Sequence, residues 1–174
     1  MIQYETIESS FFLANKKYCE VIESRLKTLN LECTGSCNCY GYEVLSTMMR
    51  DHVTYKLKFI KTQTPDRYGA IDYTGVEVTV TGLDKKIRLS FGRSLLQRLL
   101  CSPEIRMKIP KPYYIKYIDS SDSIFMYYLI ERILDNNISK IKLKDGTLKL
   151  KINEPVADPL KLIRDIELMT KKWA

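Results

Sequence analysis

The sequence predicts an α+β fold with two layers, a largely antiparallel sheet with helices on one face, and a C-terminal β-hairpin followed by a helix. Three observations predict it. Apolar and polar residues alternate in segments between residues 54 and 91 and again between residues 138 and 153. Helical periodicity dominates the two ends of the chain, and strands and helices do not alternate regularly along it. At 174 residues the chain is expected to form a single domain over residues 1–174.

The first element is expected to be a helix from Ser10, as its N-cap, to about Asn30. Its apolar face is formed by residues at helical spacing: Tyr18, Ile22, Leu26 and Leu29. The next stretch, residues 31–42, combines glycine, serine and asparagine with three cysteines. This composition is typical of turns and predicts a loop with at most a short strand.

Three alternating segments then predict three half-buried strands. Their inward-facing residues are Tyr55, Leu57 and Phe59 in the first, Val76, Val78 and Val80 in the second, and Ile87, Leu89 and Phe91 in the third. Residues 64–69 and 82–84 have the composition of turns between these strands. Four leucines between residues 95 and 100 predict a short helix that Pro103 ends, and a fourth strand is expected from Tyr113 to Ile118.

The last part of the chain predicts two helices separated by a hairpin. Capping oxygens at residues 120–123 precede an apolar run that is expected to form a buried helix ending near residue 134. Asp145-Gly146 lies between two alternating segments, which is the strongest short-range signal for a hairpin. Asp158 is expected to cap the final helix, with Pro159 at its first position. Its buried residues are expected to be Leu162, Ile166, Met169 and Trp173.

The composition favours a cytoplasmic globular protein that does not associate with membranes. Apolar residues make up 45% of the chain and charged residues 28%, as in ordinary globular domains. The N-terminal residues include acids rather than the basic start and apolar run of a secretory signal. The longest apolar run, residues 124–130, is too short to cross a bilayer. Five cysteines are an odd number, which favours a reducing compartment.

The predicted hairpin concentrates positive charge on one face. A two-residue turn at Asp145-Gly146 pairs Lys142 with Lys149 and Lys140 with Lys151, and places Lys144 opposite Thr147. Like charges that lie directly opposite repel, and phosphates would relieve that repulsion. If the other strands join the same sheet, further cations share this face. The candidate nucleic-acid-binding residues are Lys140, Lys142, Lys144, Lys149, Lys151, Lys56, Lys58 and Arg88.

Two functions compete for this chain, whose net charge is +7, and an enzyme built around the cysteine loop is a third hypothesis. The first is a module that binds DNA, RNA or another polyanion through the basic face. The alternative is a non-catalytic protein-interaction subunit of a larger or homo-oligomeric assembly, held by apolar residues such as Phe125 and Tyr128. A purely structural interpretation also exists, because lysines on an exposed strand edge prevent aggregation between edges.

The sequence favours a protein that is not an enzyme and needs no cofactor. Cys33, Cys37 and Cys39 would need a fourth ligand for a structural zinc site, so free thiols or a disulfide within the loop are the favoured interpretations. His52 is the only histidine and is expected to lie on the surface. The segment from Gly92 to Ser94 lacks the lysine and spacing of a P-loop. No catalytic or metal-binding residue is therefore predicted.

Overall fold

The computed structural model describes residues 1–5, 9–66, 69–117, 130–133, 135, 137–153, 158–171 and 173. Within these ranges the strands are β1 (Ile2–Tyr4), β2 (Cys33–Asn38), β3 (Gly41–Arg50), β4 (Val53–Asp66), β5 (Gly69–Thr81), β6 (Leu89–Arg93), β7 (Tyr113–Tyr117), β8 (Ile138–Lys144) and β9 (Thr147–Ile152). The helices are α1 (Ser10–Lys27), α2 (Leu95–Leu99), α3 (Pro103–Lys108) and α5 (Pro159–Thr170), and residues 130–133 are also helical. The α+β class predicted from the sequence is confirmed.

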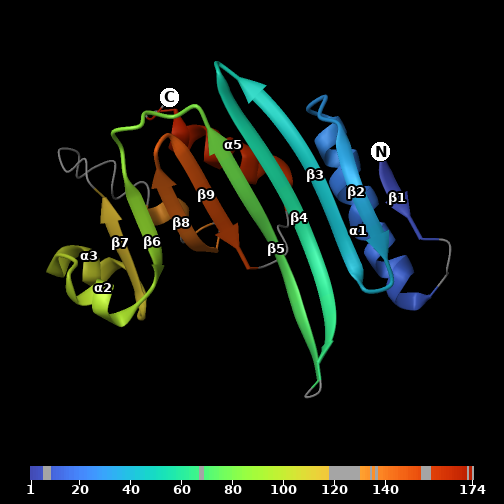
Figure 1. Ribbon diagram of the computed structural model, residues 1–174, viewed down its shortest axis with the longest axis horizontal. Coiled ribbons are helices and arrows are strands. Elements are labelled where there is room, and N and C mark those ends of the chain that lie inside the picture. Colours follow the sequence, from blue (N-terminus) through green and yellow to red (C-terminus); the bar gives the residue numbers. More distant parts are fainter. Residues whose placement is uncertain are drawn as a thin grey trace.

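The strands form one sheet in the order β1-β2-β3-β4-β5-β9-β8-β6-β7, as Figure 1 shows. Its pairs are antiparallel except for β1 and β2, which are parallel, so the sheet is mixed. The hairpin β8–β9 is inserted between β5 and β6 rather than added at an edge. The two edges are β1 and β7, and the basic hairpin is interior to the sheet.

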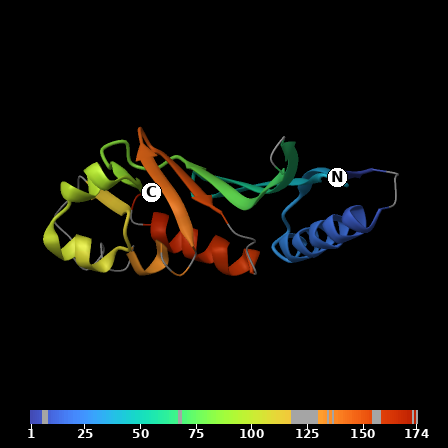
Figure 2. The same cartoon turned by 90° about the horizontal axis from the view of Figure 1, so that it is seen from below.

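Helices α1 and α5 lie on the same side of the sheet in Figure 2. The buried side chains of α1 are Phe12, Asn15, Cys19, Ile22 and Leu26. In α5 the residues of the predicted stripe, Leu162, Ile166 and Met169, are all buried, and Trp173 just beyond the helix is buried too. Together with the inward-facing side chains of the strands they form one hydrophobic cluster. Burial of each such side chain stabilises the fold by roughly 1.5–3 kcal/mol.

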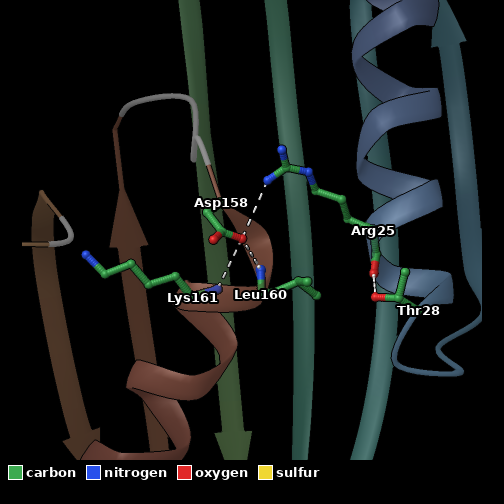
Figure 3. Close-up of polar contacts among 5 residues, drawn as sticks. All are labelled: Arg25, Thr28, Asp158, Leu160 and Lys161. Carbon is green, nitrogen blue, oxygen red and sulfur yellow. Dashed lines mark hydrogen bonds and ion pairs between the residues drawn. The ribbon is translucent and has the colours of Figure 1, made fainter.

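The N-terminus of α5 is tied to the C-terminal end of α1. Asp158 Oδ1 accepts hydrogen bonds from the backbone N–H groups of Leu160 at 3.0 Å and Lys161 at 3.3 Å, as an N-cap does. The same oxygen lies 3.5 Å from the Arg25 guanidinium of α1 (Figure 3). One carboxylate thus caps α5 and fixes its start beside α1.

Several features of the N-terminal half differ from the sequence-based expectations. The stretch predicted as a loop with at most a short strand contains the six-residue strand β2, which pairs with β1 and β3. Gly35 permits this pairing, because it adopts φ +147° and a Cβ there would lie 1.9 Å from the Glu43 carbonyl oxygen. In α1 the cap is Ser9, whose Oγ accepts from Phe12 N at 3.1 Å, and Tyr18 is exposed rather than part of the buried face.

Other boundaries also differ from expectation. The predicted turn at residues 64–69 is largely strand, since β4 extends to residue 66 and β5 starts at residue 69. The third strand starts at Leu89, and Lys86 and Ile87 precede it. Pro103 follows α2, as expected, but it is also the first residue of α3. Proline suits this position because the first backbone N–H of a helix has no hydrogen-bond partner within the helix. Most of the helix predicted near residues 120–134, with Phe125 and Tyr128, lies outside the described residues.

Candidate functional site

The candidate site is a row of side chains that crosses six neighbouring strands. The strand registers place its members directly opposite one another from β4 to β7: Lys56, Thr79, Lys149, Lys142, Ser90 and Lys116. We call this set the lysine row. All four lysines are exposed, and the two hydroxyl residues are half-buried. No carboxylate belongs to the row.

Local sequence explains why these side chains point away from the core. In the strands from β4 to β6 the neighbours on either side are apolar and buried, as with Leu148 and Leu150 around Lys149, and in β7 Lys116 follows the buried Ile115. The register of β8 and β9 is set by their turn, where Asp145 and Gly146 both have positive φ, +52° and +73°. Such a pair of residues makes the two-residue hairpin turn that matches the twist of the strands. A shift of one residue would turn the lysines into the core, so the register is strongly specified.

A second row on the same face is partly neutralised. Lys58, Glu77, Lys151 and Lys140 lie opposite one another on β4, β5, β9 and β8. Lys151 Nζ lies 3.8 Å from the carboxylate of Glu77, and Lys58 Nζ lies 2.5 Å from that of Glu43. Exposed pairs of this kind contribute only about 0–1 kcal/mol, yet they reduce the positive field along this row.

The eight predicted residues therefore fall into two groups. Lys58, Lys151 and Lys144 each have a carboxylate within 4 Å, the last from Asp145 at 3.6 Å. The others form no ion pair with any residue that the structure describes: Lys56, Lys140, Lys142, Lys149 and Arg88. Arg88 is exposed and directly precedes β6, next to the buried Leu89. The structure thus brings the seven predicted lysines to one sheet face, with Arg88 just before β6, but leaves only some of the eight residues without an internal counterion.

No protein-family model, curated protein or solved structure matches this chain. Function must therefore be inferred from the residues themselves.

Two tyrosines on the same face were not predicted as part of the site. Tyr73 lies over Gly75, where an added Cβ would come within 2.7 Å of the tyrosine hydroxyl, and Lys151 Nζ lies 4.4 Å from its ring centroid. Tyr114 lies over Gly92 and its hydroxyl is 3.1 Å from Ser90 Oγ. A glycine within an alternating segment often marks the close approach of another group, so Gly75 and Gly92 were the sequence signals that could have pointed to these tyrosines.

The cysteines do not form the loop site that the sequence left open. Cys33 and Cys37 are four residues apart in an extended strand, which separates their Cα atoms by roughly 13 Å. This exceeds the reach of a disulfide and of a shared zinc ion. All five cysteines are free thiols, and no cluster of three metal-ligating side chains occurs among the residues described.

The thiols of Cys19 and Cys37 lie against each other in the core and are not suited to nucleophilic chemistry. Burial raises the pKa of the Cys19 thiol, and the neighbouring Cys37 thiol raises it further. Burial also raises the pKa of Cys37 and Cys33. Because the thiolate is the reactive form, these groups stay neutral and inert at pH 7. His52 is exposed in the β3–β4 turn with φ +66°, as expected of a surface residue.

We expect Tyr42 to make stability fall at alkaline pH. Burial raises the pKa of Tyr42 to about 12, with Cys19 as a further cause. The Tyr42 hydroxyl loses its proton near pH 10 in the unfolded chain and near pH 12 in the folded chain. Its contribution to the stability of the fold is therefore present below about pH 10 and is lost as pH rises to about 12. A difference of two units between the unfolded and folded pKa corresponds to about 2–3 kcal/mol of stability. Urea unfolding across this range should show a shallower decline for Tyr42→Phe, while the exposed Tyr40→Phe should behave as the unmodified protein. Equal declines for both variants would contradict this assignment.

In the part of the chain that the structure describes, no helix is both long and apolar enough to span a membrane.

Proposed function

We propose that the open sheet face binds nucleic acid through its phosphates, with the lysine row as the main contact. The observation that carries the proposal is the composition of that row: four exposed lysines on β4, β9, β8 and β7, hydroxyls between them, and no carboxylate. Five strand spacings of about 4.8 Å give the row a length of roughly 24 Å. Phosphate contacts require positive charge and hydrogen-bond donors in such an array, and both are present.

The arrangement of the fold supports this use of the face. We infer a two-layer architecture in which α1 and α5 cover the inner face and the C-terminal hairpin contributes to the outer face, on the side opposite these two helices. Lysine stems lie along the sheet while the amines reach solvent. A nucleic-acid backbone can then approach the row without displacing any part of the inner layer.

Protection of a strand edge does not account for the central lysines. Strands β8 and β9 have hydrogen-bonded neighbours on both sides, so Lys142 and Lys149 guard no edge. Their direct opposition costs about 0.2–1 kcal/mol of stability. A bound phosphate removes this cost. Phosphate binding therefore explains the opposed lysines, whereas edge protection does not.

Tyr73 and Tyr114 add aromatic surface beside the basic rows. Both rings are half-buried on the same face, at β5 and at the edge strand β7. Stacking of a base on an exposed ring is worth about 1–3 kcal/mol and tolerates any base. The combination of lysines with flanking aromatic rings favours single strands, whose bases are free to stack.

The test is a salt titration of binding to fluorescein-labelled single-stranded DNA, single-stranded RNA and duplex DNA of equal length. Four phosphate contacts predict a slope of about −3 to −4 in log K against log salt, a loss on the order of 100-fold between roughly 50 and 200 mM salt. No binding at the lowest salt, or a slope near zero, would remove the proposal. Equal affinity for inorganic polyphosphate would reduce it to a general polyanion site.

A further inference from the structure

Helix α2 exposes its apolar residues and buries its charged one. Arg98 is the buried residue of this helix. Its leucines and those directly after it, with Met107 of α3, are each at least 65% exposed: Leu95, Leu96, Leu99, Leu100 and Met107. The leucines that the sequence predicted as a helical face are therefore present, but this face is not part of the described core. Large apolar side chains grouped in this way on a surface are typical of a docking site.

The buried arginine holds the α2–α3 segment in place without using the leucines. Arg98 Nη1 donates to the carbonyl oxygens of Ile109 at 2.8 Å, Pro110 at 3.2 Å and Tyr113 at 2.7 Å. Arg98 Nη2 donates to the carbonyl of Arg106. Hydrogen bonds to a charged donor are among the stronger ones in proteins. Since these contacts fix α2 against α3 and the start of β7, the leucine face is preformed.

Three of these five exposed side chains line a groove of about 630 Å³ between the two helices. Leu95, Leu99 and Met107 supply its apolar surface, and Arg106 and Lys111 supply positive charge at its lining. The volume lies within the usual range for concave binding sites. A flat lipid surface would not fill such a hollow, whereas side chains from a helix would.

We propose that this groove binds an acidic amphipathic helix of a partner protein. Its apolar residues would fill the space between Leu95, Leu99 and Met107, and its carboxylates would meet Arg106 and Lys111. Helix-in-groove recognition uses apolar anchor residues spaced three or four positions apart on the bound helix, and charges at the rim of the groove can add to it. A second copy of this chain is a poorer occupant, because each copy has a net charge of +7.

This site is separate from the proposed nucleic-acid face. It is built from α2, α3 and the segment before β7, whereas the lysine row lies on the outer face of the sheet. The two proposals therefore fail independently. A chain that binds nucleic acid at one site and an acidic partner at the other would link the two.

The probes are two fluorescein-labelled amphipathic peptides of about five helical turns, ~18 residues each, with the same leucine face. One has glutamates on its polar face and the other lysines. We expect the glutamate peptide to bind and the lysine peptide not to bind. Leu99→Ser combined with Met107→Ser should weaken binding at least tenfold, whereas Phe11→Ser, at an exposed apolar position on α1, should not. Arg106→Glu with Lys111→Glu should reverse the preference between the peptides.

Circular dichroism would show that each variant remains folded. Three results would overturn the proposal: equal binding of both peptides, loss of glutamate-peptide binding in Lys142→Glu with Lys149→Glu, or no effect of the groove variants. A dimer in analytical ultracentrifugation that Leu99→Ser dissociates would assign the groove to a second copy instead. Leucine-dependent binding to vesicles of anionic phospholipid, without peptide binding, would assign it to a membrane surface and also overturn the proposal.

Discussion

Reversal of two charges at the centre of the lysine row should reduce nucleic-acid affinity on the order of 100-fold at about 0.1 M salt. The change is Lys142→Glu with Lys149→Glu, which lie directly opposite each other on β8 and β9. Each phosphate contact contributes roughly tenfold at this salt concentration, and each glutamate adds repulsion to the lost contact. Fluorescence anisotropy would measure the loss, and the slope against log salt should become shallower by about 2.

Matched controls separate this effect from a change in net charge. Lys161→Glu with Lys171→Glu makes the same change of charge on and just after α5, the helix on the inner side of the sheet. Lys58→Glu removes a lysine that already pairs with Glu43. Both controls should weaken binding much less than the central pair. Equal losses in all three variants would mean that only total charge matters and that the row is not a site.

The single substitution Lys142→Glu distinguishes a binding face from a structural one. It replaces two opposed like charges by an opposed pair of unlike charges, which should stabilise the fold by about 0.2–1 kcal/mol. The same substitution should weaken nucleic-acid binding. A gain in stability together with a loss of affinity is expected only if the opposed lysines are retained for a ligand.

The hairpin and its basic face could be predicted because their determinants are local in sequence. Asp145 and Gly146 both adopt positive φ values, which aspartate tolerates better than most residues and glycine adopts readily because it lacks a Cβ. The turn that they form fixes Lys142 opposite Lys149. Alternation along β4 then places Lys56 on one side of the sheet, whichever strand lies beside it. Part of the lysine row could therefore be predicted, because the alternation of side chains along a strand determines the face of each lysine without knowledge of the strand order.

The other parts of the site depend on contacts between distant segments. The ion pair between Glu77 and Lys151 exists because β9 lies beside β5, a pairing that no local pattern specifies. Strand β2 was expected only as a short strand within a loop for a similar reason, since Gly35 has a poor strand propensity and is accommodated by the close approach of β3. In α2 the helical spacing of leucines was correct, but spacing alone does not show whether a face is covered.

Replacement of Arg98 by methionine should open the α2–α3 segment. Methionine is similar in length but cannot donate, so four carbonyl oxygens lose the Arg98 donor at once, and that of Pro110 keeps another, the backbone N–H of Tyr113 at 3.0 Å. Buried acceptors left without partners cost about 1–3 kcal/mol each when no water reaches them, and we expect a total of about 3–5 kcal/mol. Hydrogen exchange at the amides of α2 and α3 should then be faster by about 100- to 4,000-fold, since 1.4 kcal/mol corresponds to a factor of ten.

The same variant should also lose binding of the glutamate peptide, although every leucine and methionine of the groove remains. Arg93→Met provides the control, because Arg93 is exposed at the end of β6 and its loss should change stability by less than about 0.5 kcal/mol. Amides in the central strands β5 and β9 should exchange as before, because α2 packs against β7, at the edge of the sheet. Unchanged exchange in α2 and α3 of Arg98→Met would show that other contacts hold the segment and that its groove is not preformed by this arginine.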